Sequence, residues 1–410
     1  MVKKSDYYPL AAGSSTSETS FGINLAALLI AVVVLEICHF TGLLRGPLLF
    51  IIFTLTITLS IIGLECIFYP QTCFYTRWKI RRRINWKRVF YKEVTFIVTL
   101  SAIGLCYWAF PVFKGKNFQN EYFPFLNYFI PFLLIASLPY FCLMDRIDTT
   151  PDDIYYKLGV AIIRRQKNVT RFELGNYIRS WIIKAFYLSL MQPYMMEEIY
   201  YFFNLSWQKI KDTPVEWFYA ANACCFFIDL AYASVGYLVS FKILNSQIRT
   251  AEPTLLGWLV AIMCYYPFWG FLFYPYFFRY NEVGWMNAFQ PNSVIWWIWF
   301  ILIIGAEIIY AFASVAAGFR FSNLTYRGLF NTGPYKWTKH PAYVFKNISW
   351  WLIAVPFMAA SVSTAVKLSL LLFLNNIIYY LRAKTEERHL SHYPEYVAYA
   401  LEMNEKSIFR

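Results

Sequence analysis

Polar residues that could do chemistry gather in two short stretches near the C-terminus. The first, Arg320 to Tyr343, is rich in turn-forming residues, and the second, Arg382 to Leu390, is charged. Between them lie two apolar stretches, 344–362 and 364–381, whose connection is too short to let two helices separate. We therefore expect a polar pocket at a membrane surface, suited to a soluble, charged cosubstrate. The residues expected to meet there are Tyr335, His340, Tyr343, Arg382 and Glu386.

The elements that position these residues are those of a membrane protein. Of 410 residues, 59% are hydrophobic and 21% aromatic, and 15% are charged, against about 25% charged in soluble proteins. A packed globule has too little interior to bury so much apolar surface. The composition excludes an ordinary soluble enzyme and a disordered chain. The eight cysteines form no CxxC pair, so neither a disulfide framework nor a metal site is expected.

Ten stretches are long and apolar enough to cross a bilayer, which takes about 20 residues. The sequence therefore predicts an all-α fold, a polytopic integral membrane helical bundle of about ten transmembrane helices. The ten stretches are 22–44, 47–68, 94–112, 122–144, 180–204, 216–243, 255–275, 294–317, 344–362 and 364–381.

The net charge of +13 comes from Lys and Arg that lie mainly in the segments between the apolar stretches. With both termini in the cytoplasm, the inner segments hold 27 Lys and Arg and the outer segments hold six. This is the bias of a multi-pass protein of the plasma, inner or endoplasmic-reticulum membrane. The basic loops suit anionic lipid headgroups, so the lipid bilayer is the expected partner and nucleic acid is not.

Four acidic residues fall at membrane depth, Glu197 and Glu198 near an end of the fifth stretch, Asp229 in the sixth and Glu307 in the eighth, and the last two are the better candidates for a polar cavity. Ionisable groups there are costly and indicate function by default, which makes these two candidates for substrate binding. Hydrogen bonding between helices, with Tyr or Trp as partners, explains them equally well.

The C-terminal residues also carry a family resemblance. Gly333-Pro334-Tyr335, then Lys339-His340-Pro341-Ala342-Tyr343, then the run from Arg382 to Leu390 follow one another across the expected hairpin. This order resembles the isoprenylcysteine carboxyl methyltransferase family and the related phospholipid methyltransferases, whose pattern is G-x-Y, R-H-P-x-Y, a helical hairpin and R-x-x-x-E-E-x-x-L. The resemblance covers about 320–400, one fifth of the chain.

What the resemblance implies is an integral-membrane methyltransferase that uses S-adenosylmethionine. Its acceptor would be a membrane lipid, a lipid-linked small molecule or a prenylated carboxylate, methylated at the cytoplasmic face. Arg382 matches the arginine beside the acceptor and is the expected catalytic residue. The residues that match cofactor-binding positions are Tyr335, His340, Pro341, Ala342, Tyr343 and Glu386, with Leu329 and Phe330 in the run before them.

The resemblance also divides the chain and shows where it departs from the family. We expect a disordered cytoplasmic arm at 1–21, a transmembrane module of unknown role at 22–290, and a methyltransferase-like domain with a cytoplasmic cofactor pocket at 291–410. Lys339 stands where the family has arginine, and Phe345 where it has glycine. Both changes bear on acceptor specificity more than on cofactor binding.

The implied chemistry is consistent with these residue types. A sulfonium cation suits the carboxylate of Glu386 and the faces of Tyr335 and Tyr343. A carboxylate acceptor is ionised at neutral pH and needs no general base, and an arginine such as Arg382 can hold it bidentately. An amine acceptor would need a base or a lowered pKa.

Two other functions stay open. Membrane sterol reductases, which use NADPH, share a similar His-Pro-x-Tyr hairpin, although their tails carry a longer Arg-Asp-rich run. A transporter or lipid-handling protein with a degenerate pocket is the third possibility, favoured by Lys339 and Phe345.

Overall fold

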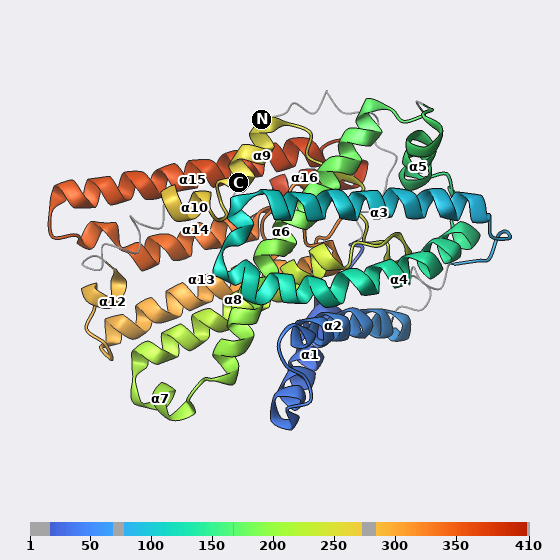
Figure 1. Cartoon of the computed structure of the whole chain (residues 1–410). Coiled ribbons are helices and arrows are strands. Elements are labelled where there is room, and N and C mark those ends of the chain that lie inside the picture. Colours follow the sequence, from blue (N-terminus) through green and yellow to red (C-terminus); the bar gives the residue numbers. More distant parts are fainter. Residues whose placement is uncertain (1–16, 69–77, 167, 273–283, 408–410) are drawn as a thin grey trace. The chain divides into compact units, whose positions relative to one another are not determined.

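The structure is a computed structural model, and it describes residues 17–68, 78–166, 168–272 and 284–407 (Figure 1). Most of these residues lie in helices, and the two strands among them, β1 (Thr250–Ala251) and β2 (Thr325–Tyr326), have two residues each. The expected fold class, an all-α polytopic membrane bundle, is confirmed.

Seven helical segments of the described chain are long and apolar enough to cross a membrane. Three of the ten expected spans form no such helix. The stretch 180–204 lies in a longer helix that carries Lys184, Glu197 and Glu198, and the described part of 255–275 forms two short helices. The seven segments are Phe21–Thr41, Pro47–Phe68, Trp86–Ala109, Phe118–Ile147, Pro214–Leu238, Val294–Arg320 and Val362–Leu390.

The third of these stretches, 344–362, contains a helix that local backbone geometry keeps short. Its helix, α14 (Pro341–Ala354), stops because Val355 adopts a left-handed conformation with φ of 34° and Pro356 follows. Proline has no backbone N–H and cannot continue the helix. The partner in the hairpin, α15 (Val362–Leu390), runs without a break past the end of the apolar stretch at 381.

The chain forms two compact units. The first comprises residues 1–25, 201–233 and 254–410, and the second comprises 26–200 and 234–253. The chain passes between them within α1 (Phe21–Thr41), α6 (Arg171–Phe203) and α8 (Pro214–Leu238), and again between Pro253 and Thr254. The domain boundaries expected from the sequence stay predictions.

The first unit is built around α13 (Val294–Ala317), which packs against α14, while α15 packs against both α14 and α9 (Leu255–Ile262). Phe218 of α8 and Trp296 of α13 form an aromatic core with Trp285. The remaining elements are α7 (Trp207–Asp212), α10 (Phe268–Leu272), α12 (Trp285–Ala288), η6 (Gly318–Arg320), η7 (Gly333–Lys336), η8 (Pro356–Met358) and α16 (Pro394–Lys406).

The second unit is centred on α3 (Trp86–Ala109), which packs against α4 (Phe123–Ile147) and α5 (Ile154–Arg164). α3 begins at Trp86 and not at 94, where the apolar stretch begins, because the side chain of Asn85 caps it by accepting from the N–H of Arg88. The remaining elements are α2 (Pro47–Phe68), η3 (Pro111–Lys114), η4 (Phe118–Tyr122) and η5 (Lys242–Leu244).

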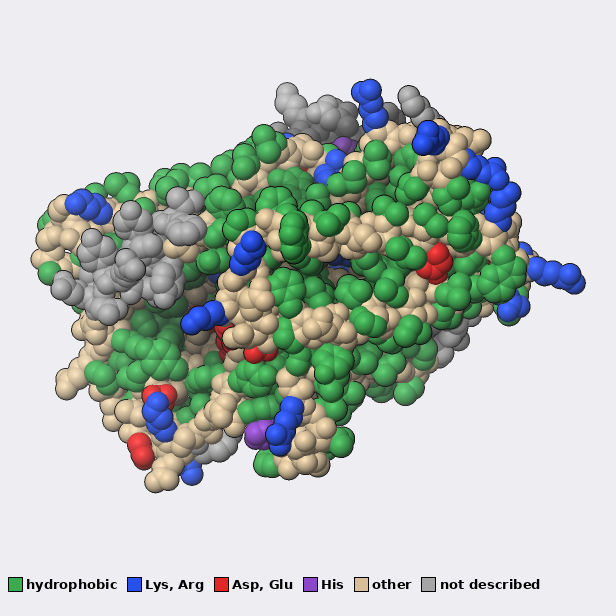
Figure 2. Space-filling model, viewed as in Figure 1, with side chains coloured by type: hydrophobic (Ala, Val, Ile, Leu, Met, Phe, Trp, Pro, Cys, Tyr) green, Lys and Arg blue, Asp and Glu red, His purple; other side chains and the backbone are tan. Residues whose placement is uncertain are grey.

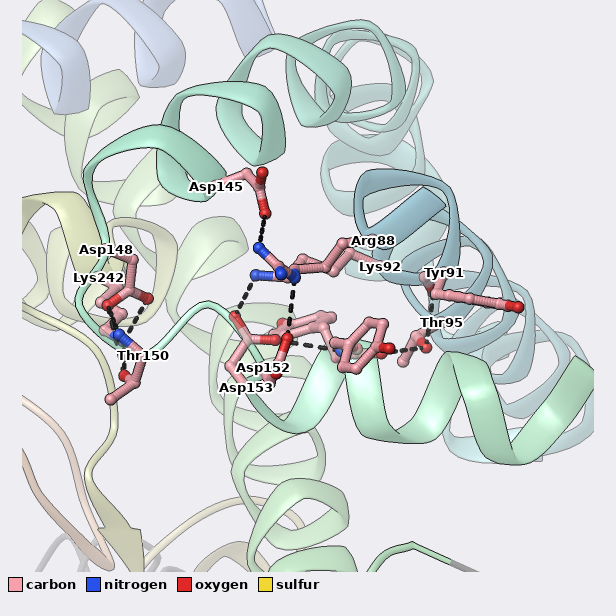
Figure 3. Close-up of polar contacts among 12 residues, drawn as sticks. Arg88, Tyr91, Lys92, Thr95, Asp145, Asp148, Thr150, Asp152, Asp153 and Lys242 are labelled. Carbon is pink, nitrogen blue, oxygen red and sulfur yellow. Dashed lines mark hydrogen bonds and ion pairs between the residues drawn. The ribbon is translucent and has the colours of Figure 1, made fainter. Parts of the chain in front are cut away.

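Ion pairs hold the polar end of this second unit together (Figure 3). Arg88 pairs with Asp145 and Asp152, both at 2.8 Å, and the fully buried Lys92 pairs with Asp153 at 2.8 Å. Several of the charges that set the positive bias of the sequence are thus partly neutralised by carboxylates. The other pair drawn there joins Lys242 to Asp148 at 2.6 Å.

Much of the outer surface is apolar. On the face drawn in Figure 2, hydrophobic side chains cover wide areas and charged side chains are sparse. Large apolar side chains stand exposed on the spanning helices, including Leu29, Leu59, Ile135 and Leu370. Such a surface is stable against lipid and not against water.

Candidate functional site

The α14–α15 hairpin brings together residues that lie far apart in the sequence. His340 occupies the N-cap position of α14, and Tyr343 follows in its first turn. Because α15 continues as a helix to Leu390, Arg382 and Glu386 are four residues apart on the same face. The hydroxyl of Tyr343 donates to Glu386 Oε2 at 2.6 Å.

The imidazole of His340 lies against both Tyr343 and the carboxylates of α15. Its ring stacks on Tyr343 with centroids 5.4 Å apart and planes 5° from parallel. Its Nε2 lies 3.2 Å from Glu387 Oε1, and its Nδ1 lies 4.0 Å from Glu386 Oε2. The side chain is therefore directed at the carboxylates of α15, and not at the backbone of the helix that it precedes.

Arg382 is buried and lies among aromatic rings. Its guanidinium carbon is 4.8 Å from the ring centroid of Tyr343, 5.5 Å from that of Tyr265 and 5.8 Å from that of Tyr379. Its Nη2 donates to the amide oxygen of Asn323, whose own nitrogen donates to the hydroxyl of Tyr265 at 2.9 Å. The faces of the three rings stabilise the positive charge.

The connector between α13 and α14 supplies the other predicted cofactor residues. Leu329 is buried in a cluster with Tyr396, Tyr399 and Met403 of α16. The ring of Phe330 meets that of Tyr335 edge-on at 4.9 Å. The hydroxyl of Tyr399 donates to the backbone carbonyl of Tyr335 at 2.8 Å.

Burial keeps three phenols neutral here, that of Tyr335 in the connector and those of Tyr396 and Tyr399 in α16. It raises the pKa of Tyr335, with a further contribution from the charge of Glu386, and it raises the pKa of Tyr399. Burial also raises the pKa of Tyr396, beside Glu387 and Glu386. All three hydroxyls therefore stay protonated at neutral pH, and that of Tyr399 donates a hydrogen bond to the connector.

Pro341, Ala342 and Lys339 surround His340. Pro341 is buried at the first position of α14, where proline is well tolerated, and Ala342 is half-buried beside it. Lys339 places its Nζ 2.9 Å from Glu387 Oε1, so the change from arginine keeps a cation facing α15. Glu387 also pairs with Lys384 of the same helix at 2.9 Å. Through its contacts with Lys339 and His340, Glu387 joins the connector to α15.

Asp229 and Glu307 are both buried between helices of the first unit. Asp229 of α8 accepts hydrogen bonds from Tyr310 and Ser314 of α13. The amide nitrogen of Asn222 of α8 donates to both carboxylate oxygens of Glu307, at 3.1 and 3.0 Å, in the amide orientation that satisfies both groups. These contacts are those of interhelical hydrogen bonding, and a role in substrate binding stays a prediction.

The sequence alone did not single out Asn323, Tyr265 and Tyr379, the neighbours of Arg382. Asn323 lies in the polar connector, so its amide side chain could have been counted among the candidate site residues from the sequence. Tyr265 and Tyr379 lie in apolar stretches among 33 tyrosines, and only the packing of α9 and α15 distinguishes them from lipid-facing rings.

Residues 299–392 match the isoprenylcysteine carboxyl methyltransferase (ICMT) family. The matched segment contains every predicted cofactor residue and Arg382, and it leaves Asp229 outside. A search of curated proteins and of solved structures finds no match. The family match and the apolar helices together support a membrane methyltransferase.

Proposed function

We propose that this chain transfers a methyl group from S-adenosylmethionine to a carboxylate of a lipid or lipid-linked, prenyl-type acceptor at the cytoplasmic face of its membrane. The observation that carries the proposal is the contact between Tyr343 and Glu386 at 2.6 Å, with Arg382 beside Tyr343. These residues lie within the segment that matches the ICMT family.

The polar groups around the connector fit such a cofactor. S-adenosylmethionine carries a sulfonium, an ammonium, a carboxylate, a ribose and an adenine. Glu386 offers a carboxylate whose side chain is 41% exposed, which suits the cationic end. The buried Thr332 Oγ1 and Tyr396 Oη have no hydrogen-bond partner among the described residues, and a polar ligand would satisfy both.

When bound, S-adenosylmethionine supplies an electrophilic methyl group: an acceptor oxygen forms the new C–O bond while the S–C bond breaks and its electron pair stays on sulfur. The task of the protein is then to align the acceptor in line with that bond. Arg382 can orient a carboxylate through two parallel N–H donors. Because the acceptor is already ionised at neutral pH, no residue has to remove a proton.

α15 exposes Leu370 and Phe373 on the part that would lie in the bilayer, so an isoprenoid or acyl chain can pack there. Arg382, nearer the polar end of the same helix, is buried and lies on the opposite face from Phe373, so the carboxylate of the acceptor would have to pass between helices to reach it. Asp229 and Glu307 stay candidates for contact with the polar part of the acceptor.

Ligand titration of the purified protein in detergent tests the proposal. We expect S-adenosylmethionine and S-adenosylhomocysteine to bind in isothermal calorimetry and NADPH not to bind. Glu386→Ala and His340→Ala should abolish the binding, whereas the control Glu402→Ala, which removes a surface ion pair with Lys406, should retain it. Binding of NADPH alone would indicate a reductase, and no binding of any of the three would indicate a non-enzymatic protein.

A further inference from the structure

The segment Ser17–Asn24, at the N-terminal end of the described chain, lies along the connector that holds the predicted cofactor residues, within the first unit. The backbone N–H of Glu18 donates to the carbonyl of Leu329 at 2.9 Å. The hydroxyl of Ser17 accepts from the N–H of Asn331 at 3.5 Å. The two contacts fix the backbone on either side of Phe330.

A partly buried ion pair strengthens this attachment. Glu18 Oε2 lies 3.2 Å from Arg320 Nη2, and the arginine side chain is only 6% exposed. Arg320 stands at the start of the connector, directly after α13. The pair therefore ties the N-terminal segment to the beginning of the connector, while the backbone contact ties it to Leu329.

The connector is also shaped to receive this segment. Three of its glycines have positive φ, and at each of them an added Cβ would collide with a different residue of Ser17–Asn24. At Gly328 the obstacle is the carboxylate of Glu18, 2.7 Å away, and at Gly333 it is the ring of Phe21, 2.8 Å away. At Gly318 it is the amide of Asn24, 2.5 Å away.

The far end of the segment is fixed to the helices of the same unit. The amide nitrogen of Asn24 donates to the carbonyl of Val315 at 2.8 Å, and Tyr232 of α8 donates to the carbonyl of Asn24. The ring of Phe21 meets Phe312 of α13 edge-on at 5.4 Å. The segment is thus anchored to α8 and α13 at one end and to the connector at the other.

We propose that Ser17–Asn24 is a positioning element that holds Gly328–Tyr335 in its binding conformation and so sets the affinity for the cofactor. The inference rests on the proposed function. The contacts described reach the connector and not Arg382, so the dissociation constant should change while kcat at saturating cofactor stays close to that of the wild type.

Phe21 and Gly333 provide a test by size compensation. Phe21→Ala and Gly333→Ala should each weaken binding of S-adenosylmethionine roughly tenfold. The double variant should bind more tightly than the product of the two single effects predicts, because truncating the ring of Phe21 removes the collision at position 333, while the strain of an alanine at φ of 58° remains in both Gly333 variants. Phe40→Ala is the matched control, since Phe40 lies on the same helix α1 and is 83% exposed.

Hydrogen–deuterium exchange on the ligand-free protein separates this inference from the proposed function. Amides of 328–335 should exchange faster in Phe21→Ala than in the wild type or in Phe40→Ala. Unchanged exchange overturns the inference, and so does faster exchange with an unaltered dissociation constant. A wild type that binds no S-adenosylmethionine contradicts the proposed function and the role in affinity, while the exchange rates still decide whether the segment holds the connector.

Discussion

The hydroxyl of Tyr343 donates to a carboxylate 43 residues further along the chain. A hydrogen bond to an ionised acceptor is stronger than one between neutral groups, and here it fixes both the ring beside Arg382 and the carboxylate expected to face the cofactor. The ring of His340 stacks on that of Tyr343, and its Nε2 lies beside Oε1 of Glu387. The site is therefore held by direct contacts between its own members.

Removing this hydroxyl should weaken the site without unfolding it. We expect Tyr343→Phe to weaken binding of S-adenosylmethionine roughly tenfold or more, since a hydrogen bond to a charged group contributes about 1.5–3 kcal/mol. Tyr380→Phe on α15 is the control, because Tyr380 is 61% exposed. Calorimetric titration measures both, and equal affinities for the two variants would contradict the role given to the hydroxyl.

Among individual residues, the sequence predicted those that belong to the ordered motif pieces. The motif pieces placed His340, Tyr343, Arg382 and Glu386 together, because a tight hairpin leaves its two ends no other arrangement. The contact of Arg382 with Tyr265, in the turn after α9, was not predictable, since nothing in the sequence relates that turn to α15. The use of Ser17–Asn24 was equally hidden, because those contacts span about 300 residues.

Among the elements, the helix boundaries departed most from the sequence pattern. α3 starts at Trp86, before the apolar stretch 94–112 begins, and α15 continues to Leu390, after the apolar stretch 364–381 has ended. Hydropathy marks the part of a helix that lipid surrounds, whereas capping and packing decide where the helix ends. α14 shows the opposite case, because Val355 and Pro356 stop it inside an apolar run.

The packing of α3 on α5 gives a prediction about stability. A Cβ on Gly159 would lie 2.6 Å from the carbonyl carbon and 2.8 Å from Cβ of Tyr91. Backbone cannot yield as a flexible side chain does, so Gly159→Ala should destabilise the second unit by about 1–3 kcal/mol. The measurement is the midpoint of thermal unfolding in detergent.

Gly104 on α3 is the matched control for this substitution. No described atom lies within 4 Å of an added Cβ there, so Gly104→Ala should leave the midpoint unchanged or raise it slightly through helix propensity. A fall of the same size in both variants would show that close approach to Tyr91 is not the cause.

For the molecule as a whole, composition determined the class of protein. The apolar content predicted the helical membrane bundle, which is confirmed, and seven helices of the described residues are long and apolar enough to span, while the number of passes stays a prediction. The placement of Lys and Arg predicts that the connector and the end of α15 face the cytoplasm, where a soluble cofactor is available. The aromatic excess is now partly explained, since tyrosines enclose Arg382.

The most direct test of the central claim is methyl transfer to lipid. Membranes containing the protein are incubated with S-adenosylmethionine labelled in its methyl group, and the lipid fraction is extracted and treated with mild alkali. The wild type should place label in that fraction, and alkali should release it as methanol because the product is an ester. Arg382→Lys, which keeps the charge and loses the planar fork, should lower the rate roughly a hundredfold, while Arg388→Lys on the same helix should not. Label that is absent from lipid and lipid-linked material alike, or that resists alkali, would contradict a carboxylate methyltransferase.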